Sequence, residues 1–530
     1  MSHQEGNSCA SDTSKKTEFH ADTKKAVNLT IDGIPVTVPE GTRILEAAKK
    51  VNVNIPVLCD HPDLCKRAVC RLCVVECDGR GKLIAACAND VWEGVSVVTN
   101  NERLMGIRKT IIELLLAHHP QDCLSCIRNT KCELQSLAEY FGIRTNPFSR
   151  DDLNTGGHLK EVSANTLTRD MAKCVKCGRC VEVCQEVQTV RAINTSHRSL
   201  NYQISTPYVQ ALSDGHCVFC GQCAAVCPVG AIYGHDQTAE VWAALTNSER
   251  HVTAMIAPPV ALVICAELGL PAGSITNGKI ITALERLGFS AIYDAACFAD
   301  MTVGEEKANL IEKLKTSKNL PVISCCMPGW FKFVKEFYPD LTEHLSSSKS
   351  PEQNFRAFVK EKNSHSKTTF VSIVPCIAKK YKAMPPGADE SKDEEIVLTG
   401  RELAQMIRLA GIDLCCIPES SFAPPPEASE PSNCKTKTGS NNIEQVLWKV
   451  YEAYDPKKDQ DDFIGNSNGT IREAVLDLNG AKVKALLAGD LGNARRIMDS
   501  IRKGDCDAAL VGIIGCSLEN ACKINGVTRQ

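Results

Sequence analysis

The sequence predicts an α+β N-terminal half built around cysteine-rich loops, followed by an α/β C-terminal domain. Residues 27–39 alternate apolar and polar side chains, as a half-exposed β-hairpin does. Closely spaced cysteine groups then occupy residues 59–227. From Val252 onward, apolar segments typical of strands alternate with helical segments. At roughly 150 residues per domain, a chain of 530 residues contains about three or four domains.

Composition excludes several classes of function. The formal net charge is −3 and no basic stripe stands out, so nucleic-acid binding is not indicated. No apolar run approaches the roughly 20 residues that span a bilayer. Residues 1–25 mix acidic side chains with lysines and contain no apolar stretch, which argues against a secretory signal or transit peptide and indicates a disordered tail. We therefore expect a cytoplasmic protein that engages neither membrane nor nucleic acid.

Cysteine is the anomalous residue, with 29 in the chain. A secreted disulfide-rich protein would be smaller and would carry a signal. In a reducing compartment such thiols act as metal ligands or catalytic groups, so the spacing of the cysteines decides between these roles.

The first cysteine group follows a predicted hairpin and a short helix. Asp32-Gly33 supplies the turn of the hairpin, and Thr42 is expected to cap a helix over residues 44–51. A cysteine-rich loop comes next. This order is typical of a β-grasp ferredoxin, which we place at residues 26–101 and call the N-terminal module.

Four thiolates in this module suit one [2Fe-2S] centre, although their spacing is not the plant type. The predicted ligands are Cys59, Cys70, Cys73 and Cys87. The nearby Cys65 and Cys77 are expected to be bystanders.

The second group follows a segment, 103–118, whose apolar residues recur at helical spacing. Its candidate ligands are His119, Cys123, Cys126 and Cys132. A lone histidine at a helix end is usually structural, but here three cysteines lack a fourth ligand and His119 stands where one is needed. We predict a histidine-ligated [4Fe-4S] centre at residues 102–150, the histidine module, with His118 as the alternative ligand. A neutral imidazole makes the cluster less negative and so raises its reduction potential.

The third group is an internal repeat of the spacing C-x2-C-x2-C-x3-C, and its second copy ends in Pro228. The first copy is Cys174, Cys177, Cys180 and Cys184, and the second is Cys217, Cys220, Cys223 and Cys227. In two-cluster ferredoxins the fourth cysteine of each run binds the other cluster. Zinc would use two CxxC pairs per ion and would not need the third step. We predict two [4Fe-4S] clusters in a dicluster module at 151–240, the first completed by Cys227 and the second by Cys184.

The C-terminal domain, at residues 250–530, has an α/β pattern. Strands are expected at residues 260–265, 322–324, 370–374 and 508–514. A proline-rich stretch at 417–442 is expected to be a solvent-exposed insertion. The vicinal Cys415-Cys416 could bind a metal but is better interpreted as a pair of packing residues. Neither a G-x-G-x-x-G after a strand nor a P-loop is present, so any flavin or NAD(P)H is expected on another polypeptide.

The order of these centres resembles two groups of proteins. One is the large iron–sulfur subunit of NADH dehydrogenases and related formate dehydrogenases. The other is the long [FeFe]-hydrogenases, including the cluster-bearing subunit of electron-bifurcating complexes. The C-terminal domain favours the second group, since Ser-Cys-Cys-Met-Pro-Gly-Trp at 324–330 resembles the family's Ser-Cys-Cys-Pro-Gly-Trp, and Val-Pro-Cys-Ile-Ala-Lys-Lys at 374–380 resembles its Met-Pro-Cys-x-x-Lys-Lys. A third loop, at 515–522, stands where the family has Cys-x3-Cys. The resemblance covers about residues 27–522.

The resemblance implies a further [4Fe-4S] cluster or an H-cluster, in which a cubane is joined to a two-iron unit. By position, the cubane ligands would be Cys326, Cys376, Cys516 and Cys522. Cys325 would be a proton-relay thiol, and Lys379 would donate a hydrogen bond to a cyanide ligand of the two-iron unit. Glu306 would belong to the proton path.

The departures from the family pattern cluster around the implied two-iron unit. Five residues rather than three separate Cys516 from Cys522, and the glycines expected after them are largely missing. Val374 and Ile514 replace methionines that pack against the unit. Asn309 stands near where a second glutamate is expected, and an amide cannot relay a proton as a carboxylate can.

Three functions remain to be weighed. The first is an iron–sulfur electron-transfer protein whose two-iron site is altered or lost, working with ferredoxin or with flavin- or NAD(P)H-binding subunits of a redox complex. The second is an active [FeFe]-hydrogenase that oxidises H₂ or reduces protons with the same partners. The third is a cluster-assembly or sensory protein, which the N-terminal and histidine modules disfavour because the assembly factors of the family lack them.

Overall fold

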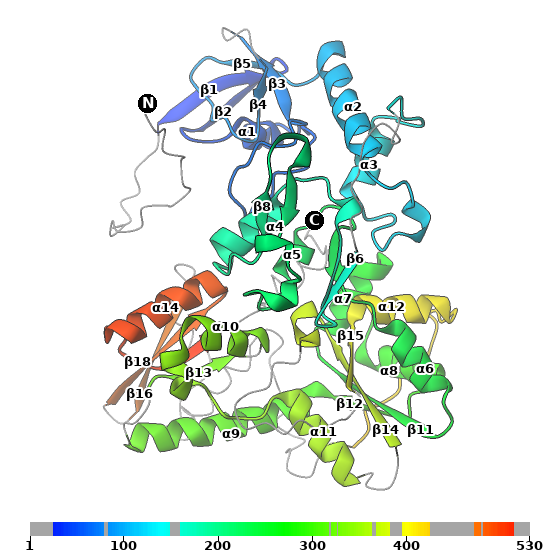
Figure 1. The fold of residues 1–530 in the computed structure, drawn as a ribbon, viewed down its shortest axis with the longest axis vertical. Helices are drawn as coiled ribbons and strands as arrows, with labels where there is room; N and C mark the ends of the chain where they lie inside the picture. The colour runs from blue at the N-terminus through cyan, green and yellow to red at the C-terminus, as the bar shows by residue number, and fades with distance from the viewer. Residues whose placement is uncertain are drawn as a thin grey trace.

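The computed structural model describes residues 25–78, 83–148, 160–316, 320–325, 327–362, 367–381, 395–424, 471–478 and 481–513. The dicluster module lies between the other two N-terminal modules and the C-terminal domain, whose two sheets occupy the opposite end of the molecule (Figure 1). The expected tail and most of the expected insertion at 417–442 fall outside the described residues.

The N-terminal module is a mixed sheet with the strand order β2-β1-β5-β3-β4, in which β1 and β5 are parallel. Its elements are β1 (Ala26–Ile31), β2 (Ile34–Pro39), α1 (Ile44–Lys50), β3 (Val74–Cys77), β4 (Ile84–Ala85) and β5 (Ser96–Val98). The hairpin turns at Asp32-Gly33, both at positive φ, as predicted. The expected cap was wrong: Arg43 is the N-cap residue of α1, and the Thr42 hydroxyl donates instead to the Pro39 carbonyl at 2.6 Å.

The histidine module is a pair of helices joined by the cysteine loop. Its elements are α2 (Glu102–Ala117), η1 (Cys123–Ser125) and α3 (Glu133–Tyr140). The Asn101 side chain caps α2 by accepting from the Leu104 N–H at 2.8 Å. The buried Arg108 of α2 donates to the carbonyls of Leu72 and Val74, which ties this helix to the cysteine loop of the N-terminal module.

The dicluster module is short helices and loops laid on a small antiparallel sheet of order β10-β7-β6. Its strands are β6 (Lys160–Ser163), β7 (Leu167–Asp170), β8 (Asn194–Ser196), β9 (Gln203–Ser205) and β10 (Ile232–Gly234). Its helices and turns are η2 (Met171–Lys173), α4 (Arg179–Glu182), η3 (Val183–Val187), η4 (Ser199–Asn201), η5 (Pro207–Val209), η6 (Leu212–Asp214) and α5 (Gln222–Ala225). Helices α4 and α5 each start from a glycine at positive φ, Gly178 and Gly221, which turns the chain sharply inside the CxxC runs.

The first sheet of the C-terminal domain is parallel and has the order β12-β11-β14-β15. Its strands are β11 (Arg250–Ile256), β12 (Ala291–Asp294), β14 (Lys367–Val374) and β15 (Glu395–Thr399), and the associated helices are α6 (Thr238–Thr246), α7 (Val260–Leu268), α8 (Asn277–Leu287), α11 (Pro351–Lys362), η8 (Ile377–Lys380) and α12 (Gly400–Leu409).

One expected strand of this sheet was wrong. Residues 260–265 belong to the helix α7, and the strand is the preceding segment β11. A continuous apolar run does not distinguish a buried strand from a buried helix by its period. The helix ends at Gly269 in the left-handed region, and it is apolar on several sides because it lies against the close-packed Gly400 of α12 as well as the sheet.

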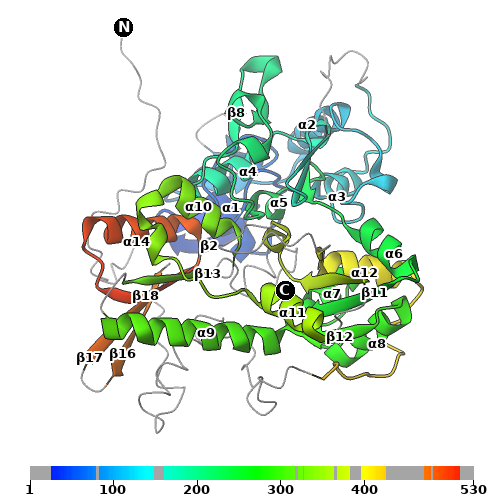
Figure 2. The same cartoon turned by 60° about the horizontal axis from the view of Figure 1, so that its bottom comes forward.

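The second sheet has the order β13-β18-β17-β16, with only β16 antiparallel to its neighbour. Its elements are β13 (Val322–Cys325), α10 (Gly329–Phe337), η7 (Pro339–His344), β16 (Ile471–Leu478), β17 (Ala481–Ala488), α14 (Leu491–Lys503) and β18 (Ala508–Ile513). The long helix α9 (Ala295–Thr316) leads from the first sheet to the second (Figures 1 and 2). The expected strands at 322–324 and 370–374 are confirmed, and so is 508–513; Ile514 lies outside the described residues.

One hydrophobic core runs from the loops of the N-terminal module through the dicluster module into the second sheet, and a separate core fills the first sheet. The cysteine loops are therefore packed against the C-terminal domain as one body. Within the described residues, none of the helices combines the length and the hydropathy that crossing a membrane requires.

Candidate metal centres

The first cysteine group converges at one edge of the N-terminal module. The Cys70 N–H donates to the Cys59 sulfur at 3.5 Å, and the Cys87 thiol hydrogen-bonds the sulfurs of both Cys59 and Cys73. Hydrogen bonds from the Cys70 and Cys87 thiols lower the pKa of Cys59 to about 2, and a bond from Cys87 lowers that of Cys73 to about 7. As donors in these bonds, Cys70 and Cys87 have raised pKa values. The four sulfurs are thus close together, as a small four-thiolate centre requires.

Cys65 and Cys77 belong to the same module. Cys77 is buried in the sheet's core from strand β3, and Cys65 is half-buried in the loop.

In the second group His119 points inward and His118 does not. His119 is 8% exposed, and no hydrogen-bond partner for its Nδ1 is found among the described residues. Burial lowers the pKa of His119, so the ring is neutral, and its other contact is the backbone carbonyl of Lys173. An unpaired nitrogen on a buried neutral imidazole is the donor that a metal requires, whereas His118 is exposed.

The three cysteines of this group lie with His119 between α2 and α3. Cys132 is buried at the start of α3, and burial raises its pKa, with smaller contributions from the nearby thiols of Cys126 and Cys123. Cys126 reaches the dicluster module, where its sulfur lies 2.8 Å from the position that a Cβ on Gly230 would occupy. Only glycine fits there, so the two modules are closely apposed at this loop.

The third group lines two separate cavities. One is lined by Cys174, Cys177, Cys180 and Cys227 together with apolar residues. The other is lined by Cys184, Cys217, Cys220 and Cys223 in a similar apolar setting. The structure therefore brings the fourth cysteine of each run to the other run's cavity.

Burial disfavours free thiolates in these cavities. Burial raises the pKa of Cys174 to about 11 and that of Cys177 and Cys217 to about 12, so anionic sulfur there needs a compensating metal charge. Among the described residues, no three His, Cys, Asp or Glu groups are gathered tightly enough for one metal ion. The buried guanidinium of Arg169 lies within electrostatic range of thiols from both cavities.

The second cavity adjoins the C-terminal domain at the loop of Cys376. The thiols of Cys220 and Cys376 are close enough for each charge to affect the other. Ile377 packs on Gly221, 3.3 Å from where a Cβ would lie, and the Phe219 and Tyr381 rings stack with centroids 4.6 Å apart.

Of the four implied cubane ligands in the C-terminal domain, the structure describes Cys376 alone. It is 4% exposed at the end of β14, and its sulfur accepts from the Ala378 N–H at 3.4 Å. Cys326, Cys516 and Cys522 lie outside the described residues. Cys325 ends β13, and its sulfur accepts from the Met327 N–H at 3.2 Å.

Glu306 lies beside the loop of Cys325. The Ser324 hydroxyl donates to its carboxylate at 2.5 Å, and Ser346 also hydrogen-bonds it. Burial outweighs these bonds and raises the pKa of Glu306. Its neighbour Glu305 instead accepts from the Lys349 N–H at 2.9 Å, at an exposed position.

Lys379 forms a buried ion pair that the sequence analysis missed. Its ammonium lies 2.9 Å from the carboxylate of Glu352, which follows the proline that starts α11. Both side chains are mostly buried, with 19% and 16% of their surface exposed. Nothing in the local pattern indicates this pair, because the two residues come from separate elements.

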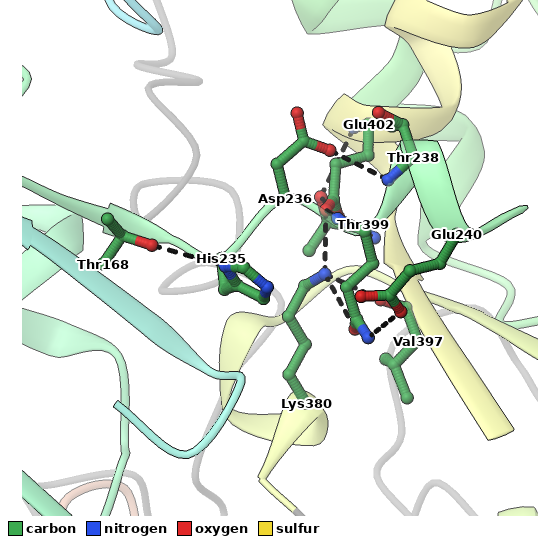
Figure 3. A network of polar contacts seen from close by, with 10 residues as sticks. Thr168, His235, Asp236, Thr238, Glu240, Lys380, Val397, Thr399 and Glu402 are labelled. Atoms are coloured by element: carbon green, nitrogen blue, oxygen red, sulfur yellow. Dashed lines mark hydrogen bonds and ion pairs between the residues drawn. The ribbon is translucent and has the colours of Figure 1, made fainter. Parts of the chain in front are cut away.

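The next residue, Lys380, joins η8 to β15 and α12 (Figure 3). Its buried ammonium donates to the Val397 carbonyl at 2.7 Å and to Glu402 at 2.8 Å. Glu402 also forms the capping box of α12 with Thr399. This network fixes η8 and with it the cysteine that precedes η8.

The vicinal pair Cys415-Cys416 does not pack in a core. Both residues are exposed, so the interpretation of the pair as packing residues was wrong. Asp413 hydrogen-bonds Cys416 and raises its pKa.

Four families match consecutive parts of the chain. Residues 24–102 match a 2Fe-2S iron-sulfur cluster binding domain, and residues 108–147 match the NADH-ubiquinone oxidoreductase-G iron-sulfur binding region. Residues 173–231 match a 4Fe-4S dicluster domain. Residues 250–524 match the iron only hydrogenase large subunit, C-terminal domain.

Curated relatives extend over most of the chain. The NADP-reducing hydrogenase subunit HndD of Solidesulfovibrio fructosivorans is 35% identical over 503 residues, which cover 90% of this chain and 85% of that protein. Iron hydrogenase 1 of Clostridium pasteurianum is 29% identical over 92% of this chain and 86% of its own length. The periplasmic [Fe] hydrogenase large subunit of Nitratidesulfovibrio vulgaris is 32% identical over 60% of this chain and 88% of its own length.

Proposed function

The chain belongs to the iron-only hydrogenase family, with 2Fe-2S and 4Fe-4S domains ahead of its hydrogenase domain, and from this we propose that it is an electron-transfer protein with an altered C-terminal site. Electrons pass along a series of clusters to or from the hydrogenase domain. The two-iron unit of that domain is modified or lost.

The proposed ligand sets are those that the spacing of the cysteines predicts. One [2Fe-2S] centre is held by Cys59, Cys70, Cys73 and Cys87. One [4Fe-4S] cluster is held by His119, Cys123, Cys126 and Cys132. Two more occupy the cavities of the dicluster module, and a further [4Fe-4S] cluster is held in part by Cys376. The module boundaries that we propose, 26–101, 102–150, 151–240 and 250–530, follow these sets.

The observation that carries the proposal is the contact between the second dicluster cavity and the C-terminal domain. Cys220 and Cys376 interact electrostatically where Gly221 contacts Ile377. A cluster in that cavity would therefore be the immediate redox neighbour of a cluster held by Cys376. Reversible electron transfer is the chemistry that such clusters supply, and the surrounding residues hold them close and exclude water.

The ion pair of Lys379 supports an altered two-iron site. In the family this lysine donates to a cyanide ligand, yet here Glu352 occupies one of its hydrogen-bond donors at 2.9 Å. The longer spacing between Cys516 and Cys522 points the same way.

A second candidate function is that of an active [FeFe]-hydrogenase. The observation in its favour is the 2.5 Å contact from Ser324 to Glu306, one residue from Cys325. Burial raises the pKa of Glu306, so this carboxyl keeps its proton to higher pH than an exposed glutamate does. In this candidate Cys325, Ser324 and Glu306 move the proton.

We also propose that a partner polypeptide supplies the nucleotide or ferredoxin chemistry. The relative HndD is named as a subunit of an NADP-reducing hydrogenase, and this sequence carries no dinucleotide fingerprint. Purified alone, the chain should contain no stoichiometric flavin. One flavin per chain would contradict the proposal that a partner polypeptide supplies this chemistry.

Infrared spectroscopy of anaerobically purified protein, coexpressed with hydrogenase maturation proteins, tests the main proposal against the second. We expect full cluster iron and sulfide with no bands from metal-bound CO or CN⁻. Such bands would support the active enzyme instead. A chain without cluster iron would contradict both candidates. The variant Cys376→Ala is the control, since it should lose the C-terminal cluster and keep the electron paramagnetic resonance (EPR) signals of the others.

A further inference from the structure

Arg179 stands at the point where the three N-terminal modules meet. Its guanidinium makes a two-pronged ion pair with Glu133 of the histidine module, at 2.6 and 2.9 Å. One of the same nitrogens donates to the Asp60 carbonyl of the N-terminal module at 2.9 Å. Arg179 is 5% exposed, whereas the side chain of Glu133 is 44% exposed, so the guanidinium is buried and its carboxylate partner faces solvent.

Each group at this junction is covalently next to a proposed cluster ligand. Asp60 follows Cys59, and Glu133 follows Cys132. Arg179 itself lies between Cys177 and Cys180, in the loop that lines the first dicluster cavity. One guanidinium therefore connects the ligand loops of three clusters.

A second link holds the same loops together. Arg67, from the cysteine loop of the N-terminal module, donates to the Gly178 carbonyl at 3.2 Å and pairs with Glu182 at 2.8 Å. The guanidinium of Arg67 also occupies the space that a side chain at Gly178 would need. The N-terminal module thus contacts the dicluster module on both sides of Cys180.

The charge of Arg179 reaches the sulfurs themselves. The thiols of Cys177 and Cys59 both lie within electrostatic range of the guanidinium. Arginine keeps its charge at any accessible pH, and its planar fork fits a carboxylate with two bonds, which lysine cannot do. A fixed buried cation favours the more negative, reduced state of a nearby cluster.

We propose that Arg179 is a positioning residue for electron transfer, which holds the [2Fe-2S] and histidine-ligated clusters beside the first dicluster cluster. Its charge also raises the reduction potentials of the clusters nearest to it. This inference rests on the proposed function, because it requires clusters at these three sites.

The test is a redox titration monitored by EPR on the full-length, cluster-loaded protein, comparing Arg179→Gln with Glu133→Gln. Removing the cation should lower the potentials of the [2Fe-2S] centre and the first dicluster cluster, and removing the anion should raise them. Both variants break the Arg179–Glu133 ion pair, so a purely structural role would change the potentials in the same direction in both, or in neither. Shifts in the same direction, or no shift, would overturn the inference. The control Arg356→Gln breaks an ion pair with Glu395 in the C-terminal domain and should leave these potentials unchanged.

The variant Arg179→Lys tests the positioning part and remains available if Arg179→Gln does not fold. It keeps the charge and loses the two-pronged bond. The magnetic interaction between the reduced [2Fe-2S] centre and its neighbours should weaken while the potentials stay near those of the parent. Unchanged magnetic interaction would overturn the positioning role. Absence of clusters in the parent protein would instead contradict the proposed function, so the two failures are distinguishable.

Discussion

Glu352 accepts a hydrogen bond from Lys379 at 2.9 Å, and this pair joins helix α11 to the loop that follows Cys376. Burial alone would raise the pKa of Glu352, but the charge and hydrogen bond of Lys379 hold it below its ordinary value. The pair is therefore ionised at neutral pH. The Lys379 ammonium is thus held by a carboxylate of the protein itself.

Replacing Lys379 by Met should destabilise the C-terminal domain, because the buried carboxylate of Glu352 is left without its cation. The loss should be about 2–4 kcal/mol, toward the lower end of what breaking a buried pair costs, since both side chains keep some exposure. Thermal unfolding followed by circular dichroism measures it. The double variant Lys379→Met with Glu352→Gln should lose less than the single one. An additive loss would contradict a direct interaction.

The stability of this domain should respond to pH with opposite signs at two carboxyls. The folded pKa of Glu352 is depressed, so its contribution is present above the unfolded value of about 4.3 and is lost as pH falls through the folded value. The folded pKa of Glu306 is raised. The folded state then keeps a proton that the unfolded state has released, so stability falls as pH rises from about 4.3 through the folded pKa.

The variant Glu306→Gln should remove that fall, and Glu352→Gln should remove the loss at acid pH. Unfolding midpoints measured across the acid and neutral range check both. If Glu306→Gln shows the parent's slope above the unfolded pKa, Glu306 does not carry the proton.

Local patterns were sufficient for much of the fold. The hairpin at Asp32-Gly33 and the helix after Asn101 depend on turn chemistry and on a 3.6-residue period, and both are present. The order of iron–sulfur and hydrogenase domains was predictable because ligand spacing is a local property of the chain. The misassigned α7 shows the limit, since burial on several sides removes the periodicity that identifies a helix.

In the candidate sites, too, local features could be predicted and tertiary contacts could not. The short CxxC spacings indicated which thiols belong to each loop, and the structure groups them around two cavities. The partners of Arg179 and Lys379 come from elements distant in the chain, at Glu133 and Glu352, and no spacing rule relates them. Charged contacts of this kind depend on tertiary packing and could not be predicted.

His119 should be the histidine ligand of the second centre. The variant His119→Cys should keep a cluster and lower its reduction potential, because a thiolate adds negative charge to the cluster. An EPR-monitored titration measures the shift. The matched control His118→Ala changes an exposed residue and should leave the potential alone. Loss of the cluster in the control, with His119→Ala unaffected, would reverse the assignment.

The fourth cysteine of each run lines the other run's cavity, and this predicts how many clusters each double cysteine variant loses. Cys184→Ala with Cys217→Ala should remove one cubane, the same amount of iron as either alone, because both line one cavity. Cys184→Ala with Cys227→Ala should remove two, since Cys227 lines the other cavity. Iron and sulfide per chain measure both. If each run instead held its own cluster, the double variant Cys184→Ala with Cys217→Ala would lose two clusters.

Gly329 should be indispensable to the contact between the dicluster module and the second sheet. A Cβ at this position would lie 1.9 Å from the carbonyl oxygen of Val218, next to Cys217. In a helix, alanine is favoured over glycine by about 1 kcal/mol, yet Gly329→Ala should destabilise by about 1–3 kcal/mol because a backbone must move. Gly304, exposed in α9 with nothing within 4 Å of its Cβ position, is the matched control.

Gly304→Ala should raise the thermal midpoint where Gly329→Ala lowers it. The Gly329 variant should also slow electron transfer between the second dicluster cluster and the site of Cys376, because the clash displaces the loop of Val218, whose Gly221 contacts Ile377. Flash reduction followed by EPR compares the rates. A Gly329 variant with the parent's stability and electron-transfer rate would show that this backbone contact is looser than 1.9 Å implies. It would also show that electron transfer to the site of Cys376 does not depend on the contact.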